Sequence, residues 1–499
     1  MKKHWLTYVF LVLSFSYVPF IVNAQIGIGN TSPDPSSILD IQSTTQGLLT
    51  PRMTTAQRTA ISSPAEGLMV FDTDLNAFYY FNGSVWTRMN ADTTTRDNYK
   101  LIKSGDNLAT VLAAELAAGS GSSYQLDANT LYEINGTVAF DFPINLNNAY
   151  IIGRDTNNDI ITRTGGGSVF EGSTGGSLRT LSVYASGGSS VFNLNLGTNE
   201  RLIAQSMVMA GLGSGTVGTI SGTAGGNNLV FFSIIQYSLF TNGITFQNLD
   251  TLLLNNLGWL PDNTGTMETL SGDFNIFSQL GGFMNVASGS TGIDVSANPV
   301  INDIGTLRNI TFAGAGTYVN GYTSNSFPGF NFTNQWEVNC TGIPRESDNN
   351  AIADLNQNAD IGSGDQTFFS SNGVASRTKL AGATTSNNLF RFSSPVDNRL
   401  VYNGAKSRFF NLAATISFQS SANNTIYIFY FAKGNSGDPT ATVVEQTRVY
   451  RGSGSSGDVG AAGIVGKVFL NPGDYVEVWG ERFSGGGNVL LVSLNVVVN

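Results

Sequence analysis

The sequence predicts an all-β protein made of many short strands. Of its 499 residues, 58 are glycine and only 12% are charged, whereas 41% are hydrophobic. A disordered chain would carry fewer apolar residues, and a helical globule would carry more Glu, Lys and Ala. Apolar runs such as "LVFFSIIQ" and "TIYIFYFAKG" are bounded by Gly, Ser and Asn, which favour turns. The length indicates two to four domains.

Residues 1–24 are predicted to be a secretory signal peptide, which implies a secreted or cell-surface protein. Lys2 and Lys3 precede a long apolar stretch, and Val22-Asn23-Ala24 is the expected cleavage site. The alternative is an uncleaved membrane anchor, which Pro19 and the cleavage site disfavour. No later stretch is long enough to span a bilayer, so the mature chain is expected to have no transmembrane segment.

Removal of this segment would exclude several kinds of catalytic and metal site from the mature chain. His4 is the only histidine, so a Ser-His-Asp triad and a His-ligated zinc site would be excluded. Without Lys2 and Lys3, 23 basic residues (25 − 2) face 35 acidic ones, a net charge of −12. Such an acidic protein is not expected to bind nucleic acid. Cys340 is the only cysteine, so no intrachain disulfide can form, and a buried packing role is expected for it.

Residues 25–95 are predicted to form an N-terminal attachment module with a β-hairpin. The segment "LMVFDTDLNAFYYFNGSVW" predicts strands at 68–72 and 77–81 joined by a tight turn. The block resembles a module at the N-terminus of many exported Bacteroidota surface or fibre proteins, which implies attachment and not a reaction. The resemblance is carried by Gly27-Ile28-Gly29, Pro33, Leu39-Asp40-Ile41, Pro51-Arg52-Met53, Gln57-Arg58, Pro64, Gly67 and "FYYFNGSVW".

Residues 104–340 are predicted to form a capping helix and a β-helix shaft. Asp106 can cap a helix over 104–119, Leu108 and Leu112 recur at helical spacing, and Gly119 ends it. Short strands then recur about every 20–25 residues, which allows about nine coils around one elongated core. This layout resembles the right-handed parallel β-helix of phage tailspikes and pectate-lyase-like proteins. A run of β-sandwiches is the alternative.

Residues 341–385 are polar and predict a connector with few strands, and residues 386–499 predict a compact antiparallel sandwich. The strand after Pro472-Gly473-Asp474 is expected to be buried on one face and to pack against another subunit on the other. The last block resembles the C1q/TNF-like jelly roll found at the ends of bacterial and phage fibres, which implies a homotrimer. The resemblance is carried by Arg391-Phe392, Arg399-Leu400-Val401-Tyr402, Phe409, Ile416-Ser417-Phe418, Tyr427-Ile428, Ala432-Lys433 and "LNPGDYVEVW".

Residues 354–365 contain a candidate calcium loop, and no other cofactor is expected. Oxygen-bearing side chains occupy its first, third, fifth, seventh and twelfth positions. Ala359 stands at the sixth position, where the motif has glycine, and an aspartate replaces the bidentate glutamate. A solvated loop is the alternative. The five candidate ligands are Asp354, Asn356, Asn358, Asp360 and Asp365.

The function classes are glycan recognition and glycan cleavage. Aromatic rings at Tyr318, Tyr322 and Trp336 could stack on sugars, with core packing as the alternative. Paired carboxylates could hydrolyse glycosides, but the sequence does not fix the distances between them. The candidate carboxylates of the shaft are Glu171, Glu200, Asp250, Asp262, Glu268, Asp273 and Asp294.

The favoured interpretation is a secreted, homotrimeric, non-catalytic adhesion or recognition protein that resembles a fibre and binds cell-surface or environmental glycans. One alternative is a tailspike-like polysaccharide depolymerase, a glycoside hydrolase or lyase that acts on the β-helix face. The other is a prophage-derived receptor-binding fibre, which the predicted signal peptide disfavours because phage fibres assemble in the cytoplasm.

Overall fold

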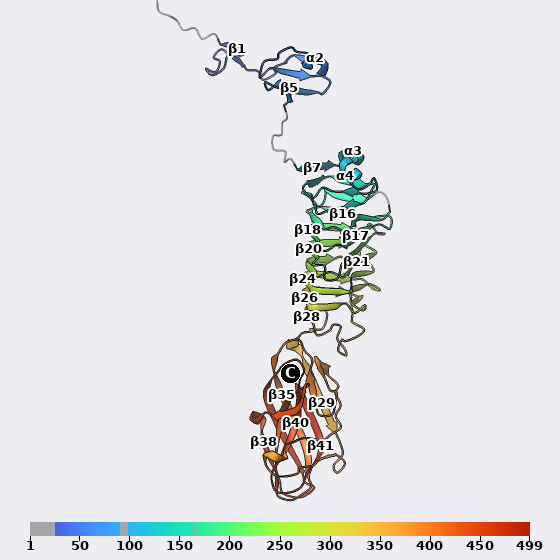
Figure 1. Ribbon diagram of the computed structural model, residues 1–499, viewed down its shortest axis with the longest axis vertical. Helices are drawn as coiled ribbons and strands as arrows, with labels where there is room; N and C mark the ends of the chain where they lie inside the picture. Colours follow the sequence, from blue (N-terminus) through green and yellow to red (C-terminus); the bar gives the residue numbers. More distant parts are fainter. Residues whose placement is uncertain (1–24, 90–97, 164–165) are drawn as a thin grey trace, which may run out of the picture. The chain divides into compact units, whose positions relative to one another are not determined.

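The computed structural model describes residues 25–89, 98–163 and 166–499 (Figure 1). The chain divides into two compact units, residues 1–96 and residues 97–499. The predicted signal peptide lies outside the described residues, as does the end of the predicted attachment module. Within the described ranges, no helix is long and apolar enough to cross a membrane.

The N-terminal unit is built on a four-stranded sheet and one short helix. β4 and β5 pair antiparallel as a hairpin, β6 extends it, and β3 runs parallel to β4. Helix α2 begins after Thr54, which forms a capping box with Gln57. Arg58 on α2 donates to buried Asp72 at 2.8 Å and ties the helix to the sheet. The elements are β1 (Ile26–Ile28), β2 (Leu39–Ile41), β3 (Arg52–Met53), α2 (Thr55–Thr59), β4 (Met69–Asp72), β5 (Ala77–Phe81) and β6 (Trp86–Arg88).

A parallel β-solenoid of about eight turns follows and has two long sheets (Figure 1). The thirteen-stranded sheet holds β7 (Tyr99–Lys103), β9 (Leu131–Asn135), β10 (Thr137–Phe140), β12 (Tyr150–Ile152), β13 (Ile160–Arg163), β15 (Gly176–Arg179), β16 (Ser182–Tyr184), β18 (Arg201–Ala210), β20 (Leu229–Ser238), β22 (Thr251–Trp259), β24 (Asp273–Val286), β26 (Val300–Gly314) and β28 (Trp336–Thr341). The nine-stranded sheet holds β8 (Tyr124–Gln125), β11 (Ile144–Asn145), β14 (Ser168–Gly172), β17 (Ser190–Leu196), β19 (Thr216–Gly222), β21 (Asn242–Gln247), β23 (Thr266–Ser271), β25 (Thr291–Asp294) and β27 (Thr317–Asn320).

Apolar side chains stack in register along the solenoid. Leu194, Ile220, Phe246 and Leu270 occupy one register position on four successive coils, and all four are buried. Two short helices, α3 (Leu108–Val111) and α4 (Ala113–Ala118), lie at the N-terminal end of the solenoid. Leu108, in α3, and Leu112, between the helices, join the same core, so they close the end of the stack.

Three long strands of the thirteen-stranded sheet, β18, β20 and β22, each bend at one residue with left-handed backbone. In β18, β20 and β22 these residues are Ser206, Ile234 and Asn256, with φ of 55°, 57° and 52°. The ladder pairing omits all three and resumes on either side. The bend therefore divides one strand between two faces of the coil. Asparagine tolerates this conformation, whereas β-branched isoleucine does so rarely.

The C-terminal head is a sandwich of two antiparallel sheets (Figure 1). One sheet holds β29 (Ile352–Asn358), β30 (Asp365–Thr367), β32 (Leu389–Phe390), β35 (Arg408–Ser420), β39 (Val459–Leu470) and β41 (Val489–Val498). The other holds β31 (Thr378–Lys379), β33 (Phe392–Ser393), β34 (Leu400–Tyr402), β36 (Thr425–Asn435), β37 (Asp438–Val443), β38 (Val449–Ser453) and β40 (Asp474–Ser484). Three short 3-10 helices, Asp348–Asn350, Val374–Ser376 and Glu445–Thr447, connect strands.

The prediction of a polar connector over residues 341–385 is wrong. This segment supplies β29, β30 and β31, and β29 pairs antiparallel with β41 over six residue pairs. Ala353, Leu355 and Phe369 are buried in the head core. The strands escape sequence analysis because they are short and polar on one side, and most of their pairing partners lie about 100 residues or more away.

The prediction for the strand after Pro472 also needs correction. Tyr475, Glu477 and Val478 of β40 are all nearly fully buried, so the chain itself covers both faces of the strand. The guanidinium of Arg399 lies 3.8 Å from the ring centre of Tyr475 and accounts for part of this cover. No second subunit is needed to bury β40.

A buried ion pair in the head also contacts the last coil of the solenoid. Arg391 pairs with Asp348 and also donates to the backbone carbonyl of Trp336 at 2.5 Å. Asp348 in turn accepts from the backbone amides of Ala405 and Lys406 at 3.2 and 2.7 Å. Both charged side chains are almost fully buried, so each depends on the other for neutralisation.

Replacement Arg391→Met should lower the free energy of unfolding by about 3 kcal/mol or more, because it leaves the buried carboxylate of Asp348 without its cation. Urea denaturation of residues 25–499 followed by tryptophan fluorescence measures the loss. Arg451→Met, at an exposed position of the head, is the matched control and should change stability little. Equal stability of both variants would contradict the role of this ion pair.

Candidate functional site

Polar side chains form columns on the outer face of the nine-stranded sheet. One column runs through Asn193, Thr219, Thr245, Thr269, Asp294 and Asn320, which pair in register from β17 to β27. A second column runs through Ser190, Thr216, Asn242, Thr266, Thr291 and Thr317. All of these side chains are half-buried or exposed. We refer to the two columns together as the polar ladder.

The polar ladder offers hydrogen-bond donors and acceptors at a regular spacing. Neighbouring strands lie about 4.8 Å apart, so hydroxyl and amide groups repeat at that interval along the solenoid. Only Asp294 is charged among the members of the two columns. Such a surface can hydrogen-bond an elongated ligand that repeats hydroxyl groups along its length. The sequence carries the signal as "TVGT", "NGIT", "TMET" and "TGID" at steps of 24 to 26 residues, and our sequence analysis missed it.

The candidate carboxylates of the shaft have separate hydrogen-bond partners. Glu200 accepts from the Gly175 amide at 2.8 Å, and Asp262 accepts from Ser238 at 2.7 Å. Glu171 accepts from the Ser168 amide, Asp250 from Asn275, and Asp294 from Ser296 and Asn320. Asp273 is exposed at the start of β24. Among the hydrogen bonds of the described residues, no two of these carboxylates share a partner.

Two of the carboxylates lie in one register column, which allows their separation to be gauged. Glu171 and Asp294 are five strand steps apart, about 24 Å at 4.8 Å per step. Retaining and inverting glycosidases need their two carboxyl groups within about 10 Å. This pair therefore cannot act together on one glycosidic bond.

Glu268 lies inside the solenoid and not on its surface. It occupies a position between Ile244 and Ile293 on the neighbouring coils, and it accepts from the side-chain amide of Gln279 at 2.8 Å. Its second oxygen has no hydrogen-bond partner among the residues that the structure describes. Complete burial raises the pKa of the Glu268 carboxyl to about 8, although the hydrogen bond from Gln279 opposes the shift. Glu268 cannot reach a ligand on the outside.

Two of the three predicted sugar-stacking aromatics belong to the core. Trp336 is fully buried and donates to the Tyr322 hydroxyl at 3.0 Å, and that hydroxyl donates to the Pro299 carbonyl at 2.6 Å. Both rings lie at the C-terminal end of the solenoid core and offer no face to a ligand. The core-packing alternative thus holds for these two residues. Tyr318 is half-buried and donates to the Gly314 carbonyl, and its role as a sugar contact stays a prediction.

The candidate calcium residues are held in an extended arrangement. Asp354, Asn356 and Asn358 lie on strand β29, so the first and third are about 13 Å apart at 3.3 Å per residue. One Ca²⁺ ion takes its ligands within about 2.6 Å, which a strand cannot provide from these positions. Asp354 instead accepts from the Asn387 and Asn388 amides at 2.8 and 3.0 Å. Asp365 accepts from Gln357 and the Ala383 amide, and Asp360 and Asp365 lie beyond the end of the strand. The geometry does not fit the proposed loop.

Comparison with known proteins gives one family match. Residues 27–100 match the model of a phage tail-like trimerisation region. The match spans the N-terminal unit and extends to the start of β7, the first strand of the solenoid, and it supports a homotrimer. Comparison with curated protein sequences gave no match.

Solved structures with distant similarity include two bacteriophage tailspike domains and murine APRIL. The enzymatically active domain of tailspike protein 2 of bacteriophage CBA120 is 11% identical, with 88% of this chain and 89% of that chain covered and a TM-score of 0.22. Tailspike protein 4 of the same bacteriophage is 10% identical, with 90% and 77% covered and a TM-score of 0.21. Murine APRIL is 11% identical, with 29% and 98% covered and a TM-score of 0.21.

Replacement Glu268→Gln should stabilise the protein increasingly as the pH rises. The carboxyl titrates near 4.5 in the unfolded chain and near 8 in the folded one. Between these values the unfolded chain releases a proton that the folded chain keeps. The stability of the unmodified protein therefore falls by about 1.4 kcal/mol per pH unit from this group alone.

Urea denaturation at about pH 5 and about pH 8 measures this dependence. The advantage of Glu268→Gln should be small at the lower pH and several kcal/mol at the higher one. Glu346, whose pKa burial raises to about 7, is present in both proteins and cancels in the comparison. Asp303→Asn, at an exposed position of the same solenoid, is the control. A pH-independent difference would contradict the burial of a titrating carboxyl.

Chelation should leave the thermal stability of the head unchanged, because Asp354, Asn356 and Asn358 are spread along the extended strand β29. The melting temperature of residues 25–499 in EDTA should equal that in millimolar Ca²⁺. An increase of many degrees on addition of Ca²⁺, lost in Asp360→Asn, would restore the calcium hypothesis for residues 354–365.

Proposed function

We propose that the protein is a secreted or cell-surface homotrimeric fibre that recognises glycans and does not cleave them. The polar ladder of the nine-stranded sheet is the observation that carries the ligand class. The trimerisation region at residues 27–100 supports the assembly state. The apolar segment at residues 1–24 supports export, and the resemblance of residues 25–95 to exported Bacteroidota proteins supports the same location.

A polysaccharide matches the chemistry of the polar ladder. Sugar hydroxyls both donate and accept hydrogen bonds, as do the Ser, Thr and Asn side chains of the two columns. The near absence of charge favours a neutral or weakly charged glycan over a polyanion. Each contact contributes about 1 kcal/mol, so one solenoid binds weakly, and three copies raise the avidity without new contacts.

Non-catalytic recognition agrees with the arrangement of the carboxylates. Glu268 is inaccessible, and the only pair that shares a register column is too widely separated to cleave a glycosidic bond. Asp250 and Asp273 lie on neighbouring coils, and a depolymerase would need such a pair to share one substrate position. The prophage-derived fibre remains the alternative origin for the same binding activity.

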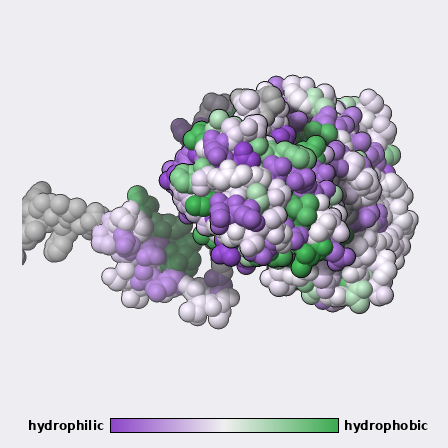
Figure 2. Space-filling model, turned by 90° about the horizontal axis from the view of Figure 1, so that it is seen from below, coloured by the Kyte–Doolittle hydropathy of each residue, from purple (hydrophilic) through white to green (hydrophobic). Residues whose placement is uncertain are grey.

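The head is proposed to be a trimeric jelly roll of the C1q/TNF type. Apolar side chains on the outer face of its six-stranded sheet support this assembly. Phe409 and Val465 are exposed, and the ring of Phe409 lies 5.0 Å from that of Phe469 on the adjacent strand. Hydrophobic patches also appear among hydrophilic residues on the surface seen from the head end (Figure 2). Apolar patches on a sheet that faces outward are typical of subunit contacts.

The triple replacement Thr219→Val/Thr245→Val/Thr269→Val tests the proposal. It removes three hydroxyls and keeps the shape of the side chains. At about 1 kcal/mol for each hydrogen bond, affinity for a bound polysaccharide should fall by about two orders of magnitude. A glycan array identifies the polysaccharide, and surface plasmon resonance measures the affinity. Thr415→Val, exposed on the head, is the control and should bind normally.

A reducing-sugar assay on the same polysaccharide should detect no turnover. Chain shortening that is lost when surface carboxylates of neighbouring coils are replaced would establish the depolymerase instead. Unchanged binding by the triple variant would remove the polar ladder from the ligand site.

A further inference from the structure

The two long sheets of the solenoid differ in their outer faces. Where the nine-stranded sheet presents the polar ladder, the outer positions of the thirteen-stranded sheet carry nine apolar side chains, mixed with polar ones, over β18, β20, β22 and β24. On these strands Ile203, Phe231 and Leu253 follow one another in register and are half-buried. The remaining apolar residues at outer positions are Val208, Leu229, Ile234, Ile276, Leu280 and Phe283, of which Ile234, Leu280 and Phe283 are exposed. We call these nine residues the apolar face.

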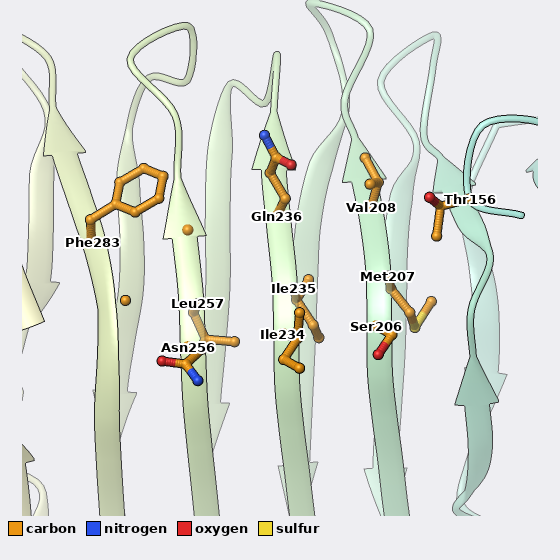
Figure 3. A pocket seen from close by; sticks show the side chains of 12 residues that line it. Thr156, Ser206, Met207, Val208, Ile234, Ile235, Gln236, Asn256, Leu257 and Phe283 are labelled. Carbon is orange, nitrogen blue, oxygen red and sulfur yellow. The ribbon is translucent and has the colours of Figure 1, made fainter.

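A shallow groove crosses the apolar face at the bend of the strands (Figure 3). It has a volume of about 520 Å³ and is lined on adjacent strands by Val208, Ile234, Leu257 and Phe283, with the polar groups of Ser206 and Asn256 beside them. A solvent-facing sheet surface is ordinarily polar, and contiguous exposed apolar surface marks a contact with another molecule. The contrast with the polar ladder on the same coils indicates that the two sheets have different surroundings.

Ile234 gives an independent indication that this face is covered. It is 54% exposed and has a φ of 57°, which costs a β-branched residue about 1–3 kcal/mol. The equivalent residues on the neighbouring coils are Ser206, Asn256 and Gly281, which suit this backbone better. An isoleucine side chain exposed to water gains no free energy of burial that could offset the backbone strain. Contact with an apolar partner surface would offset the strain.

A second copy of the same chain is the partner that fits. The trimerisation region ends at residue 100, within β7, and β7 is the first strand of the sheet that carries the apolar face. The sequences of β20 and β22 contain no charged residue, and on β18 and β24 charge occurs only at the first residue, Arg201 and Asp273. Identical surfaces without charge can approach around a symmetry axis without repulsion between like charges.

We propose that the apolar face packs against the solenoids of two other copies around a three-fold axis, with the polar ladder turned outward. The proposal rests on the trimeric state in the proposed function and adds which side of each solenoid is enclosed. It also makes the ladder accessible on all three copies at once.

Cysteine cross-linking in the full chain of residues 25–499 tests the proposal. The natural Cys340 is buried, so introduced cysteines dominate the reaction. Ile234→Cys and Phe283→Cys place a thiol on the apolar face, and Thr245→Cys and Thr269→Cys place one on the polar ladder. A short bismaleimide should link chains only through the first two variants on a denaturing gel. A bulky monofunctional maleimide should label these two at least ten times more slowly than the ladder variants.

Light scattering on the same samples tests the trimeric state separately from the choice of the interface. A single-chain mass would overturn the trimer and with it the interface. A trimeric mass with equal labelling of both faces, or with cross-links only on the ladder, would overturn the assignment of the face and leave the proposed function intact. Phe283 has ordinary strand backbone, so Phe283→Cys remains informative if Ile234→Cys perturbs the bend.

Discussion

The in-register stacking of successive coils is the constraint on which the solenoid depends. Each coil covers the open edge of the core of the preceding one, so every inward position must suit the same position on the coils above and below. The column through Leu194, Ile220 and Phe246 meets this demand with apolar side chains. Glu268 departs from it and is accommodated because Gln279 of the same coil reaches its carboxyl. A single cysteine allows no intrachain disulfide, so the fold relies on burial and backbone pairing.

Because the coils stack in register, a residue type that recurs at one outward position of successive coils forms a continuous surface. Thr219, Thr245 and Thr269 recur at one position and become part of a polar ladder, whereas Ile203, Phe231 and Leu253 recur at another and become part of an apolar face. A trimer that encloses the apolar face and exposes the ladder would use both surfaces. The head continues the chain from the last coil through the buried pair of Arg391 and Asp348, which couples the two parts of the C-terminal unit.

Much of the architecture follows from sequence patterns, and the failures have definite causes. Alternation and turn residues predict the parallel coils and the antiparallel sandwich because these patterns reflect local backbone preference and the burial of one face. The prediction for residues 341–385 is wrong because its strands pair mainly with β41 and β40, which come much later in the chain. The sugar-stacking role considered for Trp336 does not hold, because its ring fills the core of the last coil. The sequence around Trp336 does not show that this coil needs a large side chain to close its core.

The sequence by itself determined the all-β class and the lack of intrachain disulfides, because composition and strand patterning decide these. It also contained the recurrent Thr and Asn positions of the ladder. Only the tertiary structure decided which outward positions share a face, how far apart Glu171 and Asp294 lie, and that Glu268 points into the core. Coil lengths vary from one turn to the next, so register, and with it every distance between coils, is fixed by backbone pairing between residues remote in the chain.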